Sequence, residues 1–196
     1  DSAVRAIEEA VQTAEGSSNV VALSLAEYTL GVALLDRDAA ADRHRGLEVM
    51  VQARDIWLRE RAFFMIPVND LFAARERARH GDRDGAIPVM RQAVDDLHQA
   101  GRLGYGVWGT GVLVETLLER GAEGDLSEAQ EAIDRLANLP ADDGSAMREI
   151  TLLRLRALLA LARGDDVASR DLASRYRAMA ESLGFEGHIA YAEAMT

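Results

Sequence analysis

Hydrophobic residues recur at intervals of three and four along almost the whole chain, and this spacing places them on one face of an α-helix. One stripe of this kind contains the hydrophobic residues Leu47, Met50, Val51 and Leu58, and Arg54 lies on the same stripe. Glycine and aspartate interrupt the pattern at regular intervals, and runs of β-branched residues are almost absent. The pattern predicts an all-α protein.

The interruptions divide the chain into about ten expected helices. Their ranges are 2–15, 20–35, 40–61, 67–80, 83–100, 103–120, 127–139, 146–163, 165–183 and 186–195. Asn19, Asp82 and Ser145 stand where an N-cap is needed, and Pro67 suits a first helical turn. Residues 140–144 are expected to form a loop.

The interruptions also repeat. The corner at Gly81-Asp82 recurs at Gly164-Asp165, and Gly121 lies between them, 40 residues after the first glycine and 43 before the last. A period of this size with two helices per unit is typical of an α-solenoid. We therefore expect one tetratricopeptide-like superhelix of helical hairpins over residues 1–196.

The tetratricopeptide pattern places a small, a large and a small residue five, nine and twelve positions after each corner. Small residues allow two helices to approach closely, and the large residue fills the groove between them. The best unit matches with Ala86, Met90 and Ala93, and the Gly164 unit with Ser169 and Ala173. The Gly121 unit matches with Ala129 and Ile133 if three loop residues are inserted, and a divergent unit with a longer corner matches with Gly46, Met50 and Ala53.

The segment Asp82-Arg-Asp84-Gly85 resembles part of a calcium-binding loop. That loop needs acidic ligands at positions occupied here by His80 and Arg91, so calcium is excluded. The alternative is an elbow between helices, in which Gly81 adopts a left-handed conformation and Asp82 caps the next helix.

Gly104-Tyr-Gly106-Val-Trp-Gly109 matches the glycine spacing of a dinucleotide fingerprint, but that fingerprint must follow a β-strand. Close approach of a neighbouring helix or a ligand explains the glycines better. Their low helix propensity also predicts a loosened helix start. The candidate ligand- or partner-binding residues are therefore Gly104, Tyr105, Gly106 and Trp108.

Other candidate chemistry is sparse. The chain has no cysteine, and all 22 basic residues are arginine, which excludes thiolate catalysis and lysine-based chemistry. The histidines, His44, His80, His98 and His188, lack metal-ligand spacing. No catalytic residue, metal or cofactor is predicted. Trp57 and Phe63-Phe64-Met65 are expected in the core or in the packing between repeats, with a partner-binding patch as the alternative.

The net charge of −11 argues against nucleic acid and anionic membranes as partners. No uncharged run reaches the length of a membrane span, so a cytoplasmic protein is expected. The chain begins at Asp1 without methionine, which suggests a piece of a larger protein. Val4, Ile7 and Val11 lie on one face of the first expected helix, and this uncapped end predicts a weak dimer.

Four segments, 81–90, 111–118, 153–159 and 176–190, resemble the C-terminal helical region of mycobacterial signalling proteins. Those proteins combine a class III nucleotidyl cyclase domain with an AAA or NB-ARC-like ATPase and a tetratricopeptide-like tail. The resemblance implies a regulatory C-terminal module from an actinobacterium. It carries over no catalytic residue, because the chain lacks both the paired aspartates of a cyclase domain and a Walker lysine.

Two functions remain open from the sequence. The first is a non-catalytic interaction module that scaffolds or restrains other domains of the same polypeptide or binds a separate protein. The second is a sensor that holds a small-molecule effector near Tyr105 and Trp108. An enzymatic activity of this chain is not expected, because the sequence shows no recognisable nucleophile motif, no metal-ligand spacing and no lysine.

Overall fold

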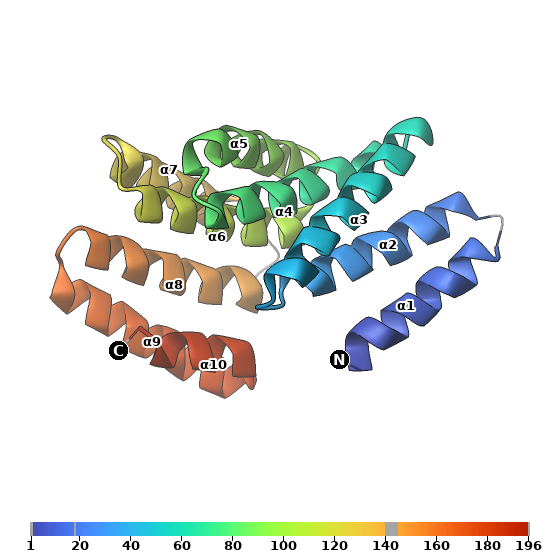
Figure 1. Ribbon diagram of the computed structural model, residues 1–196. Helices are drawn as coiled ribbons and strands as arrows, with labels where there is room; N and C mark the ends of the chain where they lie inside the picture. Colours follow the sequence, from blue (N-terminus) through green and yellow to red (C-terminus); the bar gives the residue numbers. More distant parts are fainter. Residues whose placement is uncertain (1, 18, 140–144, 196) are drawn as a thin grey trace. The chain divides into compact units, whose positions relative to one another are not determined.

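The computed structural model describes residues 2–17, 19–139 and 145–195, and these form ten α-helices and one 3-10 helix without a β-strand (Figure 1). The helices are α1 (Ser2–Glu15), α2 (Val20–Leu35), α3 (Ala40–Arg59), α4 (Ile66–Arg79), α5 (Arg83–Gln99), α6 (Leu103–Arg120), α7 (Asp125–Asn138), α8 (Ala146–Ala162), α9 (Asp166–Leu183) and α10 (Glu186–Glu193), and the 3-10 helix is η1 (Phe63–Met65). The expected all-α, helical-repeat fold is confirmed.

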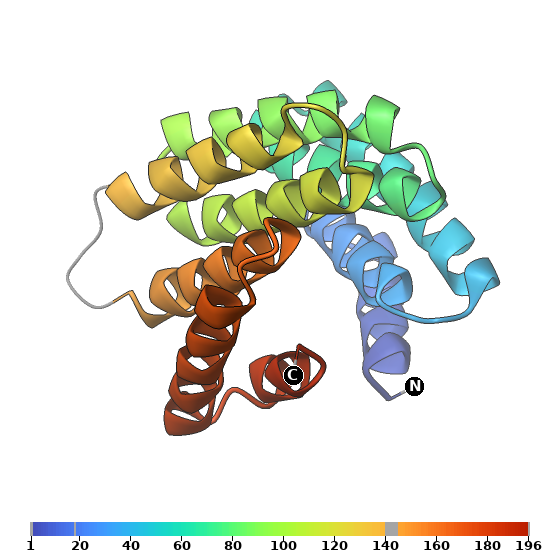
Figure 2. The same cartoon turned by 90° about the vertical axis from the view of Figure 1, so that its left-hand side faces the viewer.

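The chain divides into two compact units, an N-terminal unit that ends at Ala93 and a C-terminal unit that begins at Val94. In the N-terminal unit α2 contacts α1, α3 and α4, and α3 also contacts α4. In the C-terminal unit α6 contacts α7 and α8, α8 contacts α9, and α10 turns back beside α9 (Figure 2). One continuous superhelix over both units stays a prediction.

Glycines with positive φ end four of the helices in the same way. Gly81, Gly101, Gly164 and Gly184 have φ values of 95°, 67°, 76° and 67°. The residue after each glycine donates its N–H to the carbonyl five positions earlier, over distances of 2.9–3.1 Å. This is the Schellman arrangement, which satisfies carbonyls at the helix end while the chain reverses.

The corner at Gly81 also confirms the elbow prediction. The Asp82 carboxylate accepts a hydrogen bond from the Gly85 N–H at 3.0 Å, as an N-cap should. Asp165 accepts equivalently from the Ala168 N–H at 3.0 Å. The glycine-aspartate sequence is thus a structural corner in both places.

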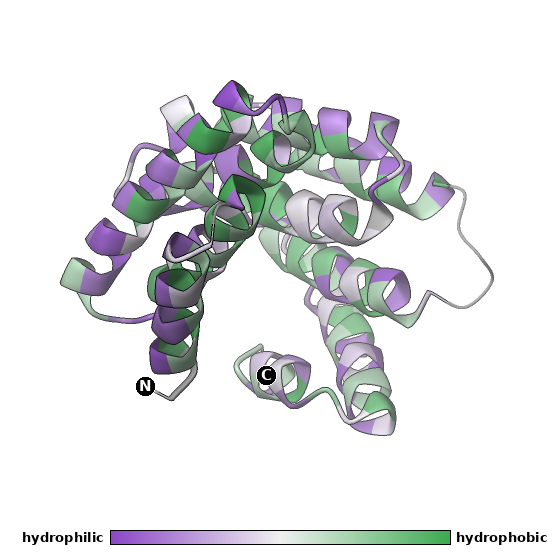
Figure 3. Cartoon of the chain, turned by 90° about the vertical axis from the view of Figure 1, so that its right-hand side faces the viewer, coloured by the Kyte–Doolittle hydropathy of each residue, from purple (hydrophilic) through white to green (hydrophobic). Residues whose placement is uncertain are grey.

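The small residues of the repeat lie where helices cross. Ala86, Met90, Ala93, Ala129, Ile133, Ser169, Ala173, Gly46, Met50 and Ala53 are all buried. The closest crossing joins α2 and α3, since a Cβ on Gly46 would lie 3.0 Å from the Gly31 carbonyl oxygen and 3.1 Å from the Leu34 Cβ. Hydrophilic and hydrophobic residues alternate along α1, which begins at the N label in Figure 3, as expected for an amphipathic helix.

Several local predictions were wrong. Ser145 precedes α8 but makes no side-chain cap bond. The α6 helix is regular from Leu103, so its glycines do not loosen its start. The α7 helix begins two residues earlier than expected, at Asp125, because the Asp125 carboxylate accepts hydrogen bonds from Arg120 and from the Ala122 N–H. The expected loop at 140–144 lies outside the described residues.

The apolar residues around the end of α3 are divided between core and surface. Trp57 is fully buried, and its indole N–H donates to the Ser24 hydroxyl at 2.8 Å. Met65 is also buried, whereas Phe63 and Phe64 are 58% and 42% exposed. The core expectation is therefore correct for Trp57 and Met65 and wrong for the two phenylalanines.

Arg61 occupies a corner of the glycine type. Its φ is 56°, and the next N–H, that of Ala62, donates to the Trp57 carbonyl at 2.8 Å. A side chain in this conformation costs about 1 kcal/mol relative to glycine.

We expect Arg61→Gly to raise the unfolding free energy by up to that amount in urea denaturation, and the reciprocal Gly81→Arg to lower it. A stability loss in Arg61→Gly would contradict this account.

Close helix approach predicts opposite effects for two glycine substitutions. Gly46→Ala should lower the unfolding free energy by about 1–3 kcal/mol, because the new Cβ meets backbone and side-chain atoms across the α2–α3 crossing. Gly104→Ala should raise it by up to about 1 kcal/mol, because its Cβ would have no neighbour within 4 Å. Thermal and urea denaturation of both variants check the pair, and equal effects would be inconsistent with it.

Candidate binding site

The four candidate residues named from the sequence lie in the first two turns of α6. Gly104 and Tyr105 are exposed, Trp108 is half-buried and Gly106 is buried. Tyr105 and Trp108 are three positions apart and share a side of the helix. Their role as a binding site stays a prediction.

Gly106 has a packing role. A Cβ at this position would lie 2.5 Å from the Cδ2 of His98, so the imidazole ring of α5 lies directly against the α6 backbone. Thr110 lies beside it, with its hydroxyl 3.4 Å from the His98 Nε2. Burial lowers the pKa of His98, and the nearby Arg135 charge lowers it further. The expected close approach is thus made by a side chain of the same unit.

A cavity of about 290 Å³ opens between α6, α8 and α10 in the C-terminal unit. Its walls combine an apolar surface with two carboxylates and one aromatic ring. They consist of Glu115, Leu118 and Glu119 from α6, Leu158, Leu161 and Ala162 from α8, and Tyr191 from α10.

An arginine holds the polar side of this cavity in place. The Arg154 guanidinium on α8 forms an ion pair with Glu115 and lies 5.2 Å from the centre of the Tyr191 ring. Gly111 makes room for it, since a Cβ there would lie 3.0 Å from an Arg154 terminal nitrogen. Gly111 is therefore the second glycine of α6 that another side chain approaches closely. The side chain in this case is Arg154, which links α8 to α6 and α10.

This cavity was not predicted from the sequence, although the repeat period of the chain contains a signal for it. Leu158, Leu161 and Ala162 follow Glu115, Leu118 and Glu119 by 43 residues each, which is the spacing from Gly121 to Gly164. Equivalent positions of consecutive repeats lie side by side in a stack of hairpins. The contribution of Tyr191 could not be inferred in this way, because α10 is shorter than the repeating helices.

A buried tyrosine and a histidine fix α10 on the unit. Tyr176 of α9 is fully buried, and its hydroxyl lies 2.8 Å from the His188 Nδ1. Burial raises the pKa of Tyr176 to about 12, so its hydroxyl stays protonated at neutral pH and shares a hydrogen bond with the His188 ring. Burial also lowers the pKa of His188, and the Arg154 charge acts in the same direction.

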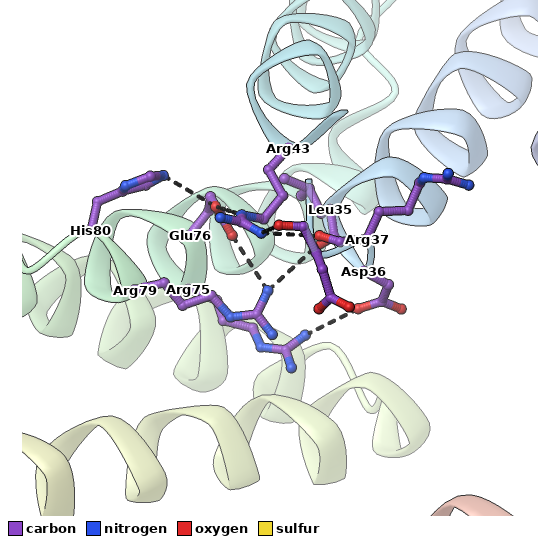
Figure 4. Close-up of polar contacts among 9 residues, drawn as sticks. Leu35, Asp36, Arg37, Arg43, Arg75, Glu76, Arg79 and His80 are labelled. Carbon is purple, nitrogen blue, oxygen red and sulfur yellow. Dashed lines mark hydrogen bonds and ion pairs between the residues drawn. The ribbon is translucent and has the colours of Figure 1, made fainter. Parts of the chain in front are cut away.

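The N-terminal unit contains a second charge cluster, centred on Glu76 of α4 (Figure 4). This carboxylate is 1% exposed and lies 3.0 Å from Arg43, 3.2 Å from His80 and 3.4 Å from Arg79. Arg79 also donates to the Leu35 carbonyl at 3.2 Å. Since its cations already satisfy the carboxylate, the cluster joins α2, α3 and α4 and is not shaped for a ligand.

Further site chemistry is limited in the described residues. They include no group of three or more histidine, aspartate or glutamate side chains that could hold a metal ion. None of the described helices is both long and apolar enough to cross a membrane. Comparisons with protein-family models, curated proteins and solved structures find no match for this chain.

The Glu76 cluster should contribute strongly to stability. Removing the Glu76 carboxylate takes away the charged hydrogen bonds that join three helices and leaves the partly buried Arg43 guanidinium without its partner, at a cost of about 1–3 kcal/mol. We expect Glu76→Ala to lower the unfolding free energy by about 2–3 kcal/mol in urea denaturation. The control Glu48→Ala removes an exposed carboxylate that pairs only with His44 and should change it by less than about 0.5 kcal/mol. Similar losses in both variants would contradict a structural role of the cluster.

The lowered pKa of His188 predicts a pH dependence. Between the folded and unfolded pKa values the unfolded chain binds more protons, so the unfolding free energy must fall as pH drops below about 6.5. His98 shifts in the same direction. Urea denaturation between pH 7.5 and 5 should show a shallower decline in His188→Gln than in the native chain or in His44→Gln. An unchanged slope in His188→Gln would contradict the prediction.

Proposed function

We propose that this chain is a non-catalytic, tetratricopeptide-like regulatory module that binds another protein or another domain of its own polypeptide. The observation that carries the proposal is the repeated helical hairpin, with matching Schellman corners and buried small residues at the crossings. Stacked hairpins of this kind present extended surfaces for partners. The resemblance to the helical tails of cyclase and ATPase signalling proteins supports the same function.

Two exposed phenylalanines of the N-terminal unit support this proposal as part of a partner surface. Phe63 and Phe64 follow the corner at Arg61, and Leu58 on the preceding turn is also exposed. Exposed apolar side chains that gather in one place mark interaction sites, and aromatic residues dominate such interfaces. This patch, formed by Leu58, Phe63 and Phe64, corresponds to the partner-binding alternative left open by the sequence.

A second candidate function is the sensing of a small-molecule effector. The cavity between α6, α8 and α10 favours it, because concave sites with apolar walls and a few polar groups are typical of ligand binding. This cavity uses the last two turns of α6, whereas Tyr105 and Trp108 lie in the first two. Ten residues separate Tyr105 from Glu115, or about 15 Å along a helix.

Site-specific crosslinking tests the interaction function. With a photoreactive benzoylphenylalanine at position 63, we expect the chain to crosslink one defined protein or domain in its native host. The same amino acid at Val167, an exposed apolar position of the C-terminal unit, serves as the matched control. Phe63→Ser should then weaken binding of the purified partner about tenfold, as loss of a central aromatic contact does. Equal crosslinking at both positions, or unchanged affinity in Phe63→Ser, would reject the patch as an interface.

A further inference from the structure

We propose that the cavity between α6, α8 and α10 binds a small uncharged molecule with an alkyl or aryl body. The proposal goes beyond the interaction function and does not depend on it, since the Leu58, Phe63 and Phe64 patch belongs to other elements of the chain. It supplies a ligand class for the effector-sensing alternative.

The volume of the cavity suits a small ligand. At about 290 Å³ it lies at the lower end of the range of roughly 300–1,000 Å³ that is usual for small-molecule sites. An apolar cavity of about 150 Å³ is large enough for benzene, so this volume has room for about ten non-hydrogen atoms. An alkyl chain or a substituted aromatic ring has this size.

Apolar side chains form most of the lining. They are Leu118 of α6 and Leu158, Leu161 and Ala162 of α8. Leu118 and Leu158 are half-buried, whereas Leu161 is 53% exposed. A ligand that covers these side chains removes their surface from water, which is favourable in proportion to the apolar area buried. The exposed Leu161 has the most surface to lose in this way.

The charged and aromatic groups of the lining are already engaged within the protein. Arg154 forms an ion pair with Glu115, and its guanidinium lies 5.2 Å from the centre of the Tyr191 ring. Glu119 also has an interaction partner. A charged ligand would have to displace one of these contacts or lose its own hydration without a new partner, which is unfavourable. An uncharged ligand meets neither cost.

The walls of the cavity are in place before a ligand arrives. Helices α6 and α8 contact each other directly. The third wall, α10, is held on the unit by the 2.8 Å contact between Tyr176 and His188. A site that is already formed loses little binding free energy to the ordering of its walls, so even a small ligand can bind measurably.

A series of linear alcohols tests the proposal on the full chain. Titrations of 1-butanol, 1-hexanol and 1-octanol are followed by the methyl NMR signals of Leu118, Leu158 and Leu161. We expect saturable binding, with a Kd of about 1 mM for 1-octanol. Each added pair of CH₂ groups should tighten binding about five- to fifteenfold, because one fully buried CH₂ group contributes about fourfold.

Charged analogues test whether the ligand must be uncharged. Hexylammonium and hexanoate should both bind about threefold or more weakly than 1-hexanol, because both carboxylates of the lining already have partners. Raising the concentration of NaCl from about 0.05 M to about 0.5 M should not weaken the binding of 1-hexanol, since salt screens only interactions between charges.

Two variants and a control locate the site. Leu161→Ala shortens an exposed wall residue and should weaken the binding of 1-octanol about threefold or more. Ala162→Phe places a large side chain in the cavity from an exposed position and should abolish binding. Val167→Ala shortens a side chain of α9 that is 74% exposed and outside the lining, and it should leave the affinity unchanged. Thermal denaturation monitored by circular dichroism checks that each variant is folded.

Any of three results would overturn the proposal: no saturable change in the three leucine signals, tighter binding of hexylammonium than of 1-hexanol, or the same 1-octanol affinity in Leu161→Ala and Val167→Ala. A cavity that accepts only a side chain of a partner protein would give the first result. None of the three bears on the interaction function, because that test reads crosslinks at position 63. Failure of the crosslinking test would likewise leave the proposed ligand site standing.

Discussion

The reversal of the chain at each helix end is the constraint on which the rest of the structure depends. A helix leaves its last carbonyls without partners, and a hairpin must satisfy them within a few residues while the direction changes. A left-handed residue followed by a hydrogen bond to the carbonyl five positions earlier achieves both. The residues that follow positions 61, 81 and 101 make this bond at intervals of 20 residues, and Gly121 ends α6 at the next interval. The resulting regularity brings equivalent residues of successive hairpins together.

The sequence could predict the elements that local chemistry controls. The predictions of the helices, of the caps at Asn19 and Asp82 and of the buried repeat positions were correct. Each of these features depends on neighbours within one helical turn or on the repeat itself. The exposure of Phe63 and Phe64 could not be predicted, since a short 3-10 turn decides their direction. The cavity was also missed, because its third wall comes from α10, outside the repeat.

The same repeat position has different uses in the two units. Glu115 and Glu119 line the cavity, whereas the residues 40 positions earlier are Arg75 and Arg79. Arg79 binds Glu76 and the Leu35 carbonyl, and Arg75 pairs with Asp36 at 3.7 Å. In one unit the position therefore joins helices, and in the other it borders an open space. In a solenoid, amino-acid substitutions alone can change such a position from joining helices to lining a cavity, since the backbone of the hairpin stays the same.

The position of α10 has a thermodynamic consequence. This helix provides Tyr191 to the cavity and is attached to the unit through the contact between Tyr176 and His188. Anything bound against Tyr191 would stabilise the docked helix, and undocking of the helix would weaken binding by the same factor, because linkage is reciprocal. Protonation of His188 enters the same equilibrium. The C-terminal helix would thus connect the occupancy of the cavity to the acidity of the solution.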